Sequence, residues 1–395
     1  MILRPAASII RGELEFGLEF EIEEGQIVAI RAHTGLPDPY VLSPAFVNAH
    51  SHLEYRGMQD AIGEREYWPW IREITRLKKL ESPEAVRAAC LLAARENRAT
   101  GVAWIGEHSD RPYAGGALAS AGVRGAIFQE VITFFERETP DEKLAAVRAK
   151  AEINRHAFGG PVYLNAHAYH TVDRKTLAAM GASGMPLSIH VAETPLESEF
   201  TALGAGSIAD FYREVGAPFE ATGRGLVASL DDLGLLRQGV QFVHCCEVQH
   251  DEIERIAQAG VSVAHCPRSN ERLGCPPPPV REMIEAGIKV GLGLDSPASS
   301  GPVDFFAEMR CALDVAQRRG RPLTGEQVWR MATCDGAASL EPAFGEGFVW
   351  RELDQLGPTP PLIQVHVEGV LTTEDVIRQA SPDRVTWARQ PVPIQ

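Results

Sequence analysis

Eight short apolar runs recur through the middle of this chain, and most are separated from the next by a stretch with helical periodicity. The runs are 45–47, 101–106, 123–131, 161–165, 186–189, 239–243, 260–264 and 289–294. Strands that are apolar throughout are typical of a parallel sheet covered on both faces. Eight of them, each followed by a helix or a loop, predict an α/β fold with a (β/α)8 TIM-type barrel rather than an open sheet.

Helix-start signals mark two of the intervening segments. Ser82 and Thr139 each stand immediately before a proline, the order expected for an N-cap followed by the first helical position. These signals predict helices over 82–98 and 141–155. A ninth apolar run, 226–231, lies in a long insertion after the fifth strand and is a further strand candidate.

The two ends of the chain have a different pattern, in which apolar and polar residues alternate. Residues 14–22 show this period of two near the N-terminus, and residues 363–370 show it near the C-terminus. Such alternation predicts half-buried strands of an antiparallel sheet. We therefore expect 1–43 and 360–395 to meet in one small β-sandwich domain, and 44–359 to form the barrel.

The chain is acidic, with a net charge of −15 over 395 residues. Nucleic-acid binding requires clustered Lys and Arg, and no basic patch stands out, so no nucleic-acid partner is expected. No apolar run is long enough to span a bilayer, and the N-terminus lacks a signal pattern, so no membrane association is expected either. The seven cysteines form no disulfide framework or Cys-x-x-Cys knuckle, which favours the cytoplasm.

Polar residues follow the predicted strands at the place where a barrel carries its active site, the carboxyl ends of the strands. His50 and His52 lie in the loop expected after the first strand, and residues two apart in an extended segment project to the same side. The residues that follow later strands are His190 and Glu193 after the fifth, His244 after the sixth, His265 to Asn270 after the seventh and Asp295 after the eighth.

Three imidazoles and one carboxylate make a donor set for one divalent metal ion. His50, His52, His190 and Asp295 supply this set and leave one position open for water. These ligand types suit zinc best and also suit iron. Glu193 lies three residues after His190, where it is placed to take a proton from water and deliver it to a leaving nitrogen.

His244 remains to orient the nucleophile and to stabilise charge, and Asp295 is able to accept a proton as well as bind metal. Some barrel hydrolases bridge two metals with a carbamylated lysine at a strand end. This chain has six lysines, and Lys289, the one in a predicted strand, opens the eighth strand at the opposite end. We therefore expect a mononuclear site.

Other residues near the strand ends allow two interpretations. His167 and His170, after the fourth strand, suit packing as well as substrate binding. His108, after the second strand, has no partner motif, and a structural role is favoured. His265 suits a substrate contact and a buried hydrogen-bonded role equally. Three cysteines are interpreted as small buried hydrophobes, namely Cys245, Cys246 and Cys266.

Taken together, five segments resemble the amidohydrolase superfamily. They are Pro44-Ala-Phe-Val-Asn-Ala-His-Ser-His52, His190-Val-Ala-Glu193, Val243-His244, His265-Cys-Pro-Arg-Ser-Asn270 and Gly291-Leu-Gly-Leu-Asp-Ser296. The closer resemblance is to the branch of cytosine, guanine and S-adenosylhomocysteine deaminases and triazine chlorohydrolases. It implies the same four metal ligands, an acid–base pair of Glu193 and His244, and a barrel with a small β domain. Ala45 and Leu294 depart from the usual Gly and Thr, and neither is a ligand.

Within this branch, Ser51-His-Leu-Glu54 followed by Tyr67-Trp-Pro-Trp-Ile-Arg72 resembles the aminodeoxyfutalosine deaminases of menaquinone biosynthesis. Their substrate is a 6-aminopurine nucleoside that carries a carboxyphenyl ketone. The resemblance implies aromatic walls at Trp68 and Trp70, although packing of both rings in a helix over the barrel mouth is equally compatible with the sequence. It also implies that Arg56 or Arg72 meets the carboxylate.

Residues 165–172 resemble the fourth-strand signature of adenosine-type members, which implies His167 at the substrate, and Asn270 is included among the substrate-binding residues. The expected protein is a metal-dependent aminohydrolase of a small nucleoside, 6-aminodeoxyfutalosine in particular, able to pair as a homodimer. The alternatives are a deaminase of adenosine, S-adenosylhomocysteine, guanine or cytosine, a triazine-type chlorohydrolase, and a barrel relative without catalytic activity.

Overall fold

The computed structural model describes residues 1–133 and 139–388, and all eight predicted apolar runs are strands in it. They are β7 (Phe46–Ser51), β8 (Val102–Ser109), β9 (Arg124–Val131), β10 (Val162–Ala166), β11 (Leu187–Val191), β12 (Val240–His244), β13 (Ser262–His265) and β14 (Val290–Leu292). Parallel pairing joins them into two four-stranded sheets, β7-β8-β9-β10 and β11-β12-β13-β14. The predicted α/β class is confirmed.

The two parallel sheets meet at both of their edges. Isolated parallel bridges join Ser51 to Asp295 at the β7–β14 edge, and Ala168 to His190 at the β10–β11 edge. Backbone hydrogen bonds accompany them. The Asp295 amide donates to the His50 carbonyl oxygen over 3.0 Å, and the His190 amide donates to the His167 carbonyl oxygen over 3.0 Å. These contacts lie at the carboxyl ends of the strands.

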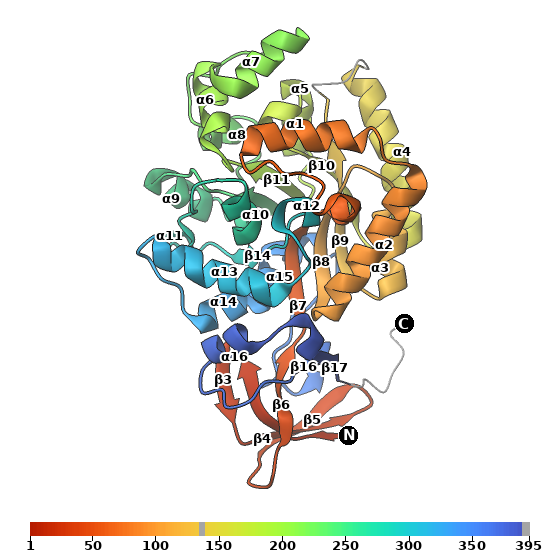
Figure 1. The fold of residues 1–395 in the computed structure, drawn as a ribbon, viewed down its shortest axis with the longest axis vertical. Coiled ribbons are helices and arrows are strands. Elements are labelled where there is room, and N and C mark those ends of the chain that lie inside the picture. Colours follow the sequence, from red (N-terminus) through yellow and green to blue (C-terminus); the bar gives the residue numbers. More distant parts are fainter. Residues whose placement is uncertain (134–138, 389–395) are drawn as a thin grey trace.

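Helices follow the strands, and the longer ones cover the sheets on the outside (Figure 1). They are α2 (Pro83–Ala99), α3 (Ala114–Ala121), α4 (Pro140–Phe158), α5 (Arg174–Ala182), α9 (His250–Gln258), α10 (Pro267–Arg272), α11 (Val280–Glu285), α12 (Pro297–Ser300), α13 (Phe305–Arg318), α14 (Gly325–Ala332) and α15 (Cys334–Leu340). The predicted caps are confirmed, since Ser82 accepts the amide of Ala85, and Thr139 forms a capping box with Glu142.

Two predicted elements differ in the structure. The run 226–231 is not a strand but helix α8 (Leu226–Asp231), with Leu226 and Leu230 buried one turn apart. It follows α6 (Pro195–Leu203) and α7 (Gly206–Val215) in the insertion. A short apolar run has no periodicity that separates a buried helix from a strand.

The second difference concerns the segment expected to be a loop after the first strand. β7 continues through Ser51, because Asn48 pairs with Ile105 and Ser51 pairs with Glu107 on β8, with a register shift between the two pairs. His50 therefore lies within a strand, and His52 follows directly after it. Pairing with a neighbouring strand set this boundary, and a sequence window does not contain that neighbour.

Helix α1 (Tyr67–Lys78) lies over the carboxyl ends of the strands (Figure 1). Tyr67, Trp70 and Ile74 of this helix share one apolar cluster with Leu273, after α10, and Ala298 of α12. The segment before α1 contains the short helix η1 (Leu53–Met58). α1 is therefore held by residues that follow β7, β13 and β14.

The two ends of the chain meet, as predicted. One sheet has the order β17-β16-β6-β2-β3 and the other has the order β1-β4-β5-β15. Their strands are β1 (Ile2–Leu3), β2 (Pro5–Ile10), β3 (Glu13–Phe16), β4 (Leu18–Glu23), β5 (Gln26–Ala32), β6 (Asp38–Pro44), β15 (Gly357–Pro358), β16 (Leu362–Val365) and β17 (Val385–Trp387), and α16 (Thr373–Gln379) lies between the last two. The β2–β6 pair is parallel, which corrects the expectation of antiparallel strands throughout.

An apolar cluster connects these two sheets. Phe20 and Ile27 from one sheet pack in it with Leu42 and Leu362 from the other, and all four side chains are buried. The sheets lie at the end of the molecule opposite α1 (Figure 1). Of the segment 360–395 expected in this part, residues 389–395 lie outside the described residues.

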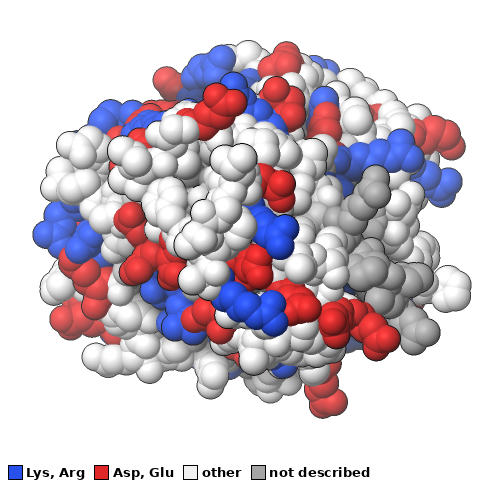
Figure 2. All heavy atoms as spheres, turned by 90° about the horizontal axis from the view of Figure 1, so that it is seen from below, with Lys and Arg blue, Asp and Glu red and all other residues white. Residues whose placement is uncertain are grey.

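Acidic and basic side chains are interspersed on the face at the small sheets (Figure 2). That face shows no large area of Lys and Arg alone, in agreement with the acidic net charge. Among the helices of residues 1–133 and 139–388, none has both the length and the apolar character needed to cross a membrane.

Candidate active site

The six side chains predicted to bind metal or move protons lie at the carboxyl ends of the two parallel sheets, and all are buried. They are His50, His52, His190, Glu193, His244 and Asp295. β7 carries His50, and His52 follows this strand directly. β11 carries His190, and Glu193 lies in the turn after it. β12 ends at His244, and Asp295 follows β14. Strands far apart in the sequence thus deliver these groups to one place.

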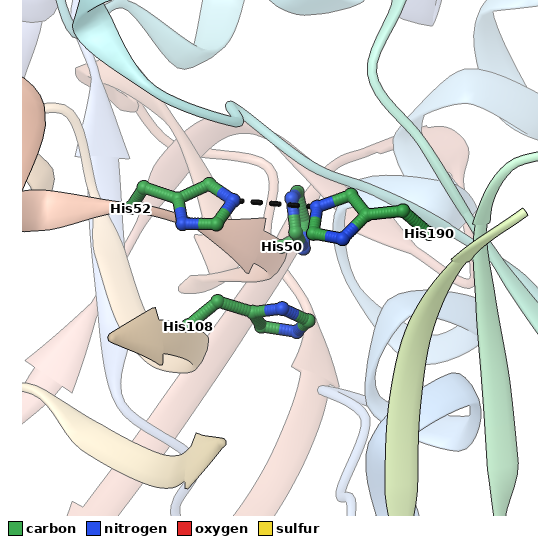
Figure 3. A group of neighbouring side chains, drawn as sticks. All are labelled: His50, His52, His108 and His190. Atoms are coloured by element: carbon green, nitrogen blue, oxygen red, sulfur yellow. Dashed lines mark hydrogen bonds between the residues drawn. The ribbon is translucent and has the colours of Figure 1, made fainter. Parts of the chain in front are cut away.

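Four donor atoms converge on one point. The Nε2 atoms of His52 and His190 are 3.4 Å apart. The Oδ1 atom of Asp295 lies 3.6 Å from Nε2 of His50 and 3.8 Å from Nε2 of His52. The imidazoles of these histidines are turned toward one another (Figure 3). His50, His52 and His190, together with His108, offer ligand atoms within 4.8 Å of one another, and Asp295 does so with His50 and His244.

The protonation of the imidazoles suits a cation. His190 donates its Nδ1–H to the carbonyl oxygen of His167 over 2.7 Å, which leaves the Nε2 lone pair for the centre of the group. Burial lowers the pKa of His190 to about 4 and holds the pKa of His52 well below its usual range. Both rings are then neutral at pH 7, the form that binds metals.

Unpaired atoms point to the same conclusion. Both ring nitrogens of His50 and Nδ1 of His52 have no hydrogen-bond partner among the described residues. Buried polar atoms are normally paired, so a cluster of unpaired imidazole nitrogens indicates a binding site. Three imidazoles and a carboxylate fit a divalent transition metal.

Asp295 supplies the negative charge of the group. Burial alone would raise the pKa of its carboxyl group, but the surrounding imidazoles, that of His50 first, outweigh burial and hold this pKa well below its usual range. The backbone φ angles of Asp295 and His244 are 54° and 76°, in the left-handed region. Non-glycine residues seldom adopt this conformation, and it is concentrated at functional sites.

Glu193 and His244 form a neighbouring pair, with Oε2 of Glu193 3.6 Å from Nε2 of His244. Burial and the nearby carboxylates of Asp295 and Glu197 raise the pKa of Glu193 well above its usual range. The Tyr67 hydroxyl of α1 lies beside the Glu193 carboxylate and acts to lower this pKa, but burial outweighs it. A carboxyl group with a raised pKa holds a proton near neutral pH and is able to give it up, as a general acid must.

Asn270 contacts His244. Its Nδ2 donates to Nδ1 of His244 over 2.9 Å, and its Oδ1 has no partner among the described residues. Because Nδ1 accepts this bond, the neutral imidazole carries its proton on Nε2, which faces Glu193. Asn270 therefore orients the ring, and its predicted contact with substrate would use Oδ1.

His167 and Trp70, both predicted to bind substrate, lie in different surroundings. The His167 ring centroid is 4.8 Å from that of His190, and its Nδ1 lies 3.0 Å from the Thr171 hydroxyl, which leaves Nε2 free for a ligand. Trp70 is on the buried side of α1, with 6% of its surface exposed, and packs in one apolar cluster with Tyr55 and Leu273. His167 thus borders the donor group, whereas the Trp70 ring is mainly part of the packing.

The two predicted carboxylate-binding arginines differ in environment. Arg56 makes two hydrogen bonds to Glu96 of α2, at 2.7 and 2.8 Å, so its guanidinium group is already paired. The Arg72 side chain on α1 is 55% exposed, and its Nη2 lies 3.8 Å from Oε1 of Glu214 on α7. Arg72 is the freer of the two, and substrate contact by either residue stays a prediction.

The sequence patterns do not single out two residues that the structure places beside the donor group. His108, at the end of β8, has its ring centroid 4.3 Å from that of His50 (Figure 3). Oε1 of Glu130, at the end of β9, lies 4.0 Å from Nδ1 of His108. The available signal is position alone, since both follow the rule that barrel sites use strand ends.

The arrangement combines a cation site with a buried acid–base pair. A nucleophilic water at the cation would lie next to a group able to accept and return protons. This combination suits hydrolysis of a bond to carbon with a poor leaving group such as an amine.

Comparison with known proteins agrees with this chemistry. The model of the Amidohydrolase family matches residues 41–343. Over 290 residues, 69% of this chain and 68% of the relative, the chain is 32% identical to an aminodeoxyfutalosine deaminase from Deinococcus radiodurans. It is 28% identical over 312 residues, 75% of this chain and 68% of the relative, to a 5-methylthioadenosine/S-adenosylhomocysteine deaminase from Natronomonas pharaonis.

The fold also resembles a solved structure. An adenosine deaminase from Xanthomonas campestris with bound zinc superposes with a TM-score of 0.80 at 23% identity, covering 98% of this chain and 90% of that one. At this level of identity the likeness shows a shared fold.

Proposed function

Because the chain belongs to the amidohydrolase family and is a hydrolase of C–N bonds, we propose that it deaminates a 6-aminopurine nucleoside. We further propose 6-aminodeoxyfutalosine, an intermediate of menaquinone biosynthesis, as its substrate. The observation that carries the proposal is the convergence of three imidazole nitrogens and one carboxylate oxygen beside the pair formed by Glu193 and His244.

The donor group would hold one divalent metal ion, zinc in the first place, through His50, His52, His190 and Asp295. Zinc is supported by the imidazole-rich set and by the zinc in the adenosine deaminase of similar fold. Such an ion lowers the pKa of water and supplies a nucleophile near neutral pH. The chain's own residues then have to position the purine and move protons.

Glu193 would perform the proton transfers. Its buried carboxyl group, with a raised pKa, would donate a proton to the ring nitrogen beside the amino-bearing carbon, take up the proton of the hydroxyl added at that carbon and deliver it to the leaving amine. His244, with its proton on Nε2, would donate a hydrogen bond to the charge that develops at the reacting carbon. Asp295, ionised in the structure, would accept a proton from the attacking water.

Helix α1 supports the finer substrate assignment. The relative from Deinococcus radiodurans carries the name aminodeoxyfutalosine deaminase, and the segments that resemble such enzymes are 51–54 and 67–72, the second of which lies in α1. α1 covers the site and presents Arg72 at its solvent side, where a substrate carboxylate outside the buried purine site could reach it.

Three further features belong to the same proposal. The two parallel sheets would form one closed (β/α)8 barrel, which the bridges at both sheet edges support. Residues 44–359 would form this barrel domain, and 1–43 with 360–395 would form the small β-sandwich. A cytoplasmic location is supported by seven free cysteines and no disulfide bond.

The test is ammonia release from a substrate panel by zinc-loaded protein. The panel contains 6-aminodeoxyfutalosine, adenosine, S-adenosylhomocysteine, 5-methylthioadenosine, guanine, cytosine and a chlorotriazine. Turnover of the first compound far above the others would support the full proposal. Turnover of another nucleoside would keep the reaction and replace the substrate. Chloride release from the triazine without any deamination would refute the deaminase assignment.

A further inference from the structure

Two partly buried arginines at the amino ends of β8 and β9 have no acidic partner. Arg98 lies in the last turn of α2, which precedes β8, and Arg124 is the first residue of β9. Among residues 1–133 and 139–388, no group forms an ion pair or a hydrogen bond with either guanidinium group. This distinguishes both from Arg56, which bonds to Glu96 of α2.

Each of the two guanidinium groups lies over an indole ring. Cζ of Arg98 is 3.1 Å from the ring centroid of Trp387 on β17, and Cζ of Arg124 is 4.2 Å from that of Trp104 on β8. Trp387 also donates its Nε1–H to the Arg98 carbonyl oxygen over 3.1 Å, which joins α2 to the small sheets (Figure 1). An indole face stabilises a cation but offers no oxygen to the guanidinium N–H groups. The rings therefore hold both cations in place and leave their hydrogen-bond donors available.

The two positive charges also act on each other. Burial and the charge of Arg124 lower the pKa of Arg98 to about 10, and burial lowers the pKa of Arg124. No carboxylate among the described residues opposes either shift. Arg237, whose pKa burial also lowers, instead bonds to three backbone carbonyl oxygens. Holding two cations together without a counter-ion is costly, so the pair indicates a site for an anion.

We propose that Arg98 and Arg124 bind a phosphate group, either as inorganic phosphate or as the phosphate monoester of a small metabolite. A phosphate group carries a charge near −2 at pH 7 and so neutralises both cations, whereas a carboxylate neutralises one. Guanidinium groups bind phosphate oxygens through paired N–H donors.

This site is separate from the candidate active site and goes beyond the proposed function. β9 is eight residues long, and Arg124 begins it, whereas the metal-binding set lies at the carboxyl ends of the strands. A strand of this length spans roughly 25 Å. A phosphate group bound by the two arginines therefore does not contact the groups that carry out deamination.

The test measures binding of inorganic phosphate to the full-length protein by isothermal titration calorimetry. The wild type should bind one equivalent, and R98Q and R124Q should each weaken binding about 10- to 150-fold, because each removes hydrogen bonds between charged groups. R95Q is the matched control, since Arg95 is exposed and lies one turn before Arg98 on α2. Its affinity for phosphate should stay within about twofold of the wild type, because solvent screens an exposed charge.

Two further titrations distinguish the sources of the anion. Tighter binding of glycerol 3-phosphate than of inorganic phosphate would identify a phosphate monoester as the ligand, and the reverse order would identify free phosphate. Acetate should bind at least about tenfold more weakly than either, because it neutralises only one of the two cations. Equal affinity for acetate would refute the phosphate assignment.

A second measurement does not depend on the folding of any variant. Phenylglyoxal modifies accessible guanidinium groups, and peptide mass spectrometry reports the modification at each arginine. In the wild type, phosphate at ten times its Kd should slow the modification of Arg98 and Arg124 about tenfold, by mass action, and leave that of Arg95 unchanged.

Each other outcome overturns the proposal. No binding of phosphate and no protection of the two arginines would remove the site. Binding that persists in both R98Q and R124Q would lie elsewhere, for example at a metal ion in the active site. An equal loss in R95Q would show an unspecific effect of charge. None of these results bears on deamination, which the ammonia assay tests separately.

Discussion

Replacing Glu193 by glutamine isolates the proton transfers from the rest of the site. Glutamine has almost the same shape, so it keeps the packing and is able to bond to Tyr67, but it does not titrate. Glu193 is not one of the four donors of the metal group, and its Oε2 lies 3.6 Å from His244 instead. We therefore expect E193Q to fold, to bind metal as the wild type does and to lose turnover.

The expected loss is about 10⁴-fold in kcat, the upper end of the range for a general acid–base group and about 5.4 kcal/mol of transition-state stabilisation. The upper end applies because the neighbouring carboxylates are engaged elsewhere. Glu197 accepts the backbone amide of Glu193 over 2.8 Å, and Asp295 belongs to the donor group. Neither is placed to substitute for the missing proton carrier.

The assay is steady-state ammonia release, accompanied by metal content and thermal unfolding for each variant. E197Q is the matched control. Its amide oxygen is still able to accept the Glu193 backbone amide. Even complete loss of this one hydrogen bond would reduce kcat by only about fivefold, so E197Q should stay within that limit. Turnover of E193Q within tenfold of the wild type, or loss of its metal, would refute the role given to Glu193.

Three further predictions concern other parts of the molecule. N270A leaves Nδ1 of the buried His244 unpaired, so kcat should fall about 5- to 150-fold with little change in KM. A rise in KM as large as the fall in kcat would argue against an orienting role. R72A should raise KM about tenfold for 6-aminodeoxyfutalosine and leave KM for adenosine unchanged in the same assay. Burial raises the pKa of Glu308 from 4.5 to about 8, so between these values the unfolded state releases a proton that the folded state keeps. The free energy of unfolding should therefore fall by up to about 1.4 kcal/mol per pH unit as pH rises, and E308Q should flatten this dependence in urea titrations at about pH 5 and about pH 8.

Strand positions and the main site residues could be predicted because each depends on local signals. The apolar runs are strands in the structure because continuous Val, Ile and Leu segments pair with equally buried neighbours. His50, His52 and Asp295 could be located because barrel sites use residues next to strand ends, whichever strands adjoin in space. The run 226–231 gave the wrong element, since six apolar residues fit a buried helix as well as a strand.

The substrate-binding predictions show where local signals end. A sequence indicates that Arg56 and Arg72 are cations near an aromatic segment, but it does not indicate that Glu96 of α2 lies beside Arg56. The burial of Trp70 on the inner side of α1 likewise depends on Leu273, which is distant in the chain. Pairing and packing between distant segments thus decide which side chains remain available to a ligand.

The sequence by itself determined the alternation of strands and helices, the meeting of the two chain ends and the identity of the candidate donors, because these follow from periodicity and from residue type at strand ends. The tertiary structure decided which atoms face each other. It placed Nε2 of His190 toward His52 by bonding Nδ1 to the His167 carbonyl, and it brought the unpaired His108 and Glu130 beside them. Those arrangements depend on the pairing of strands far apart in the chain, which local sequence does not encode.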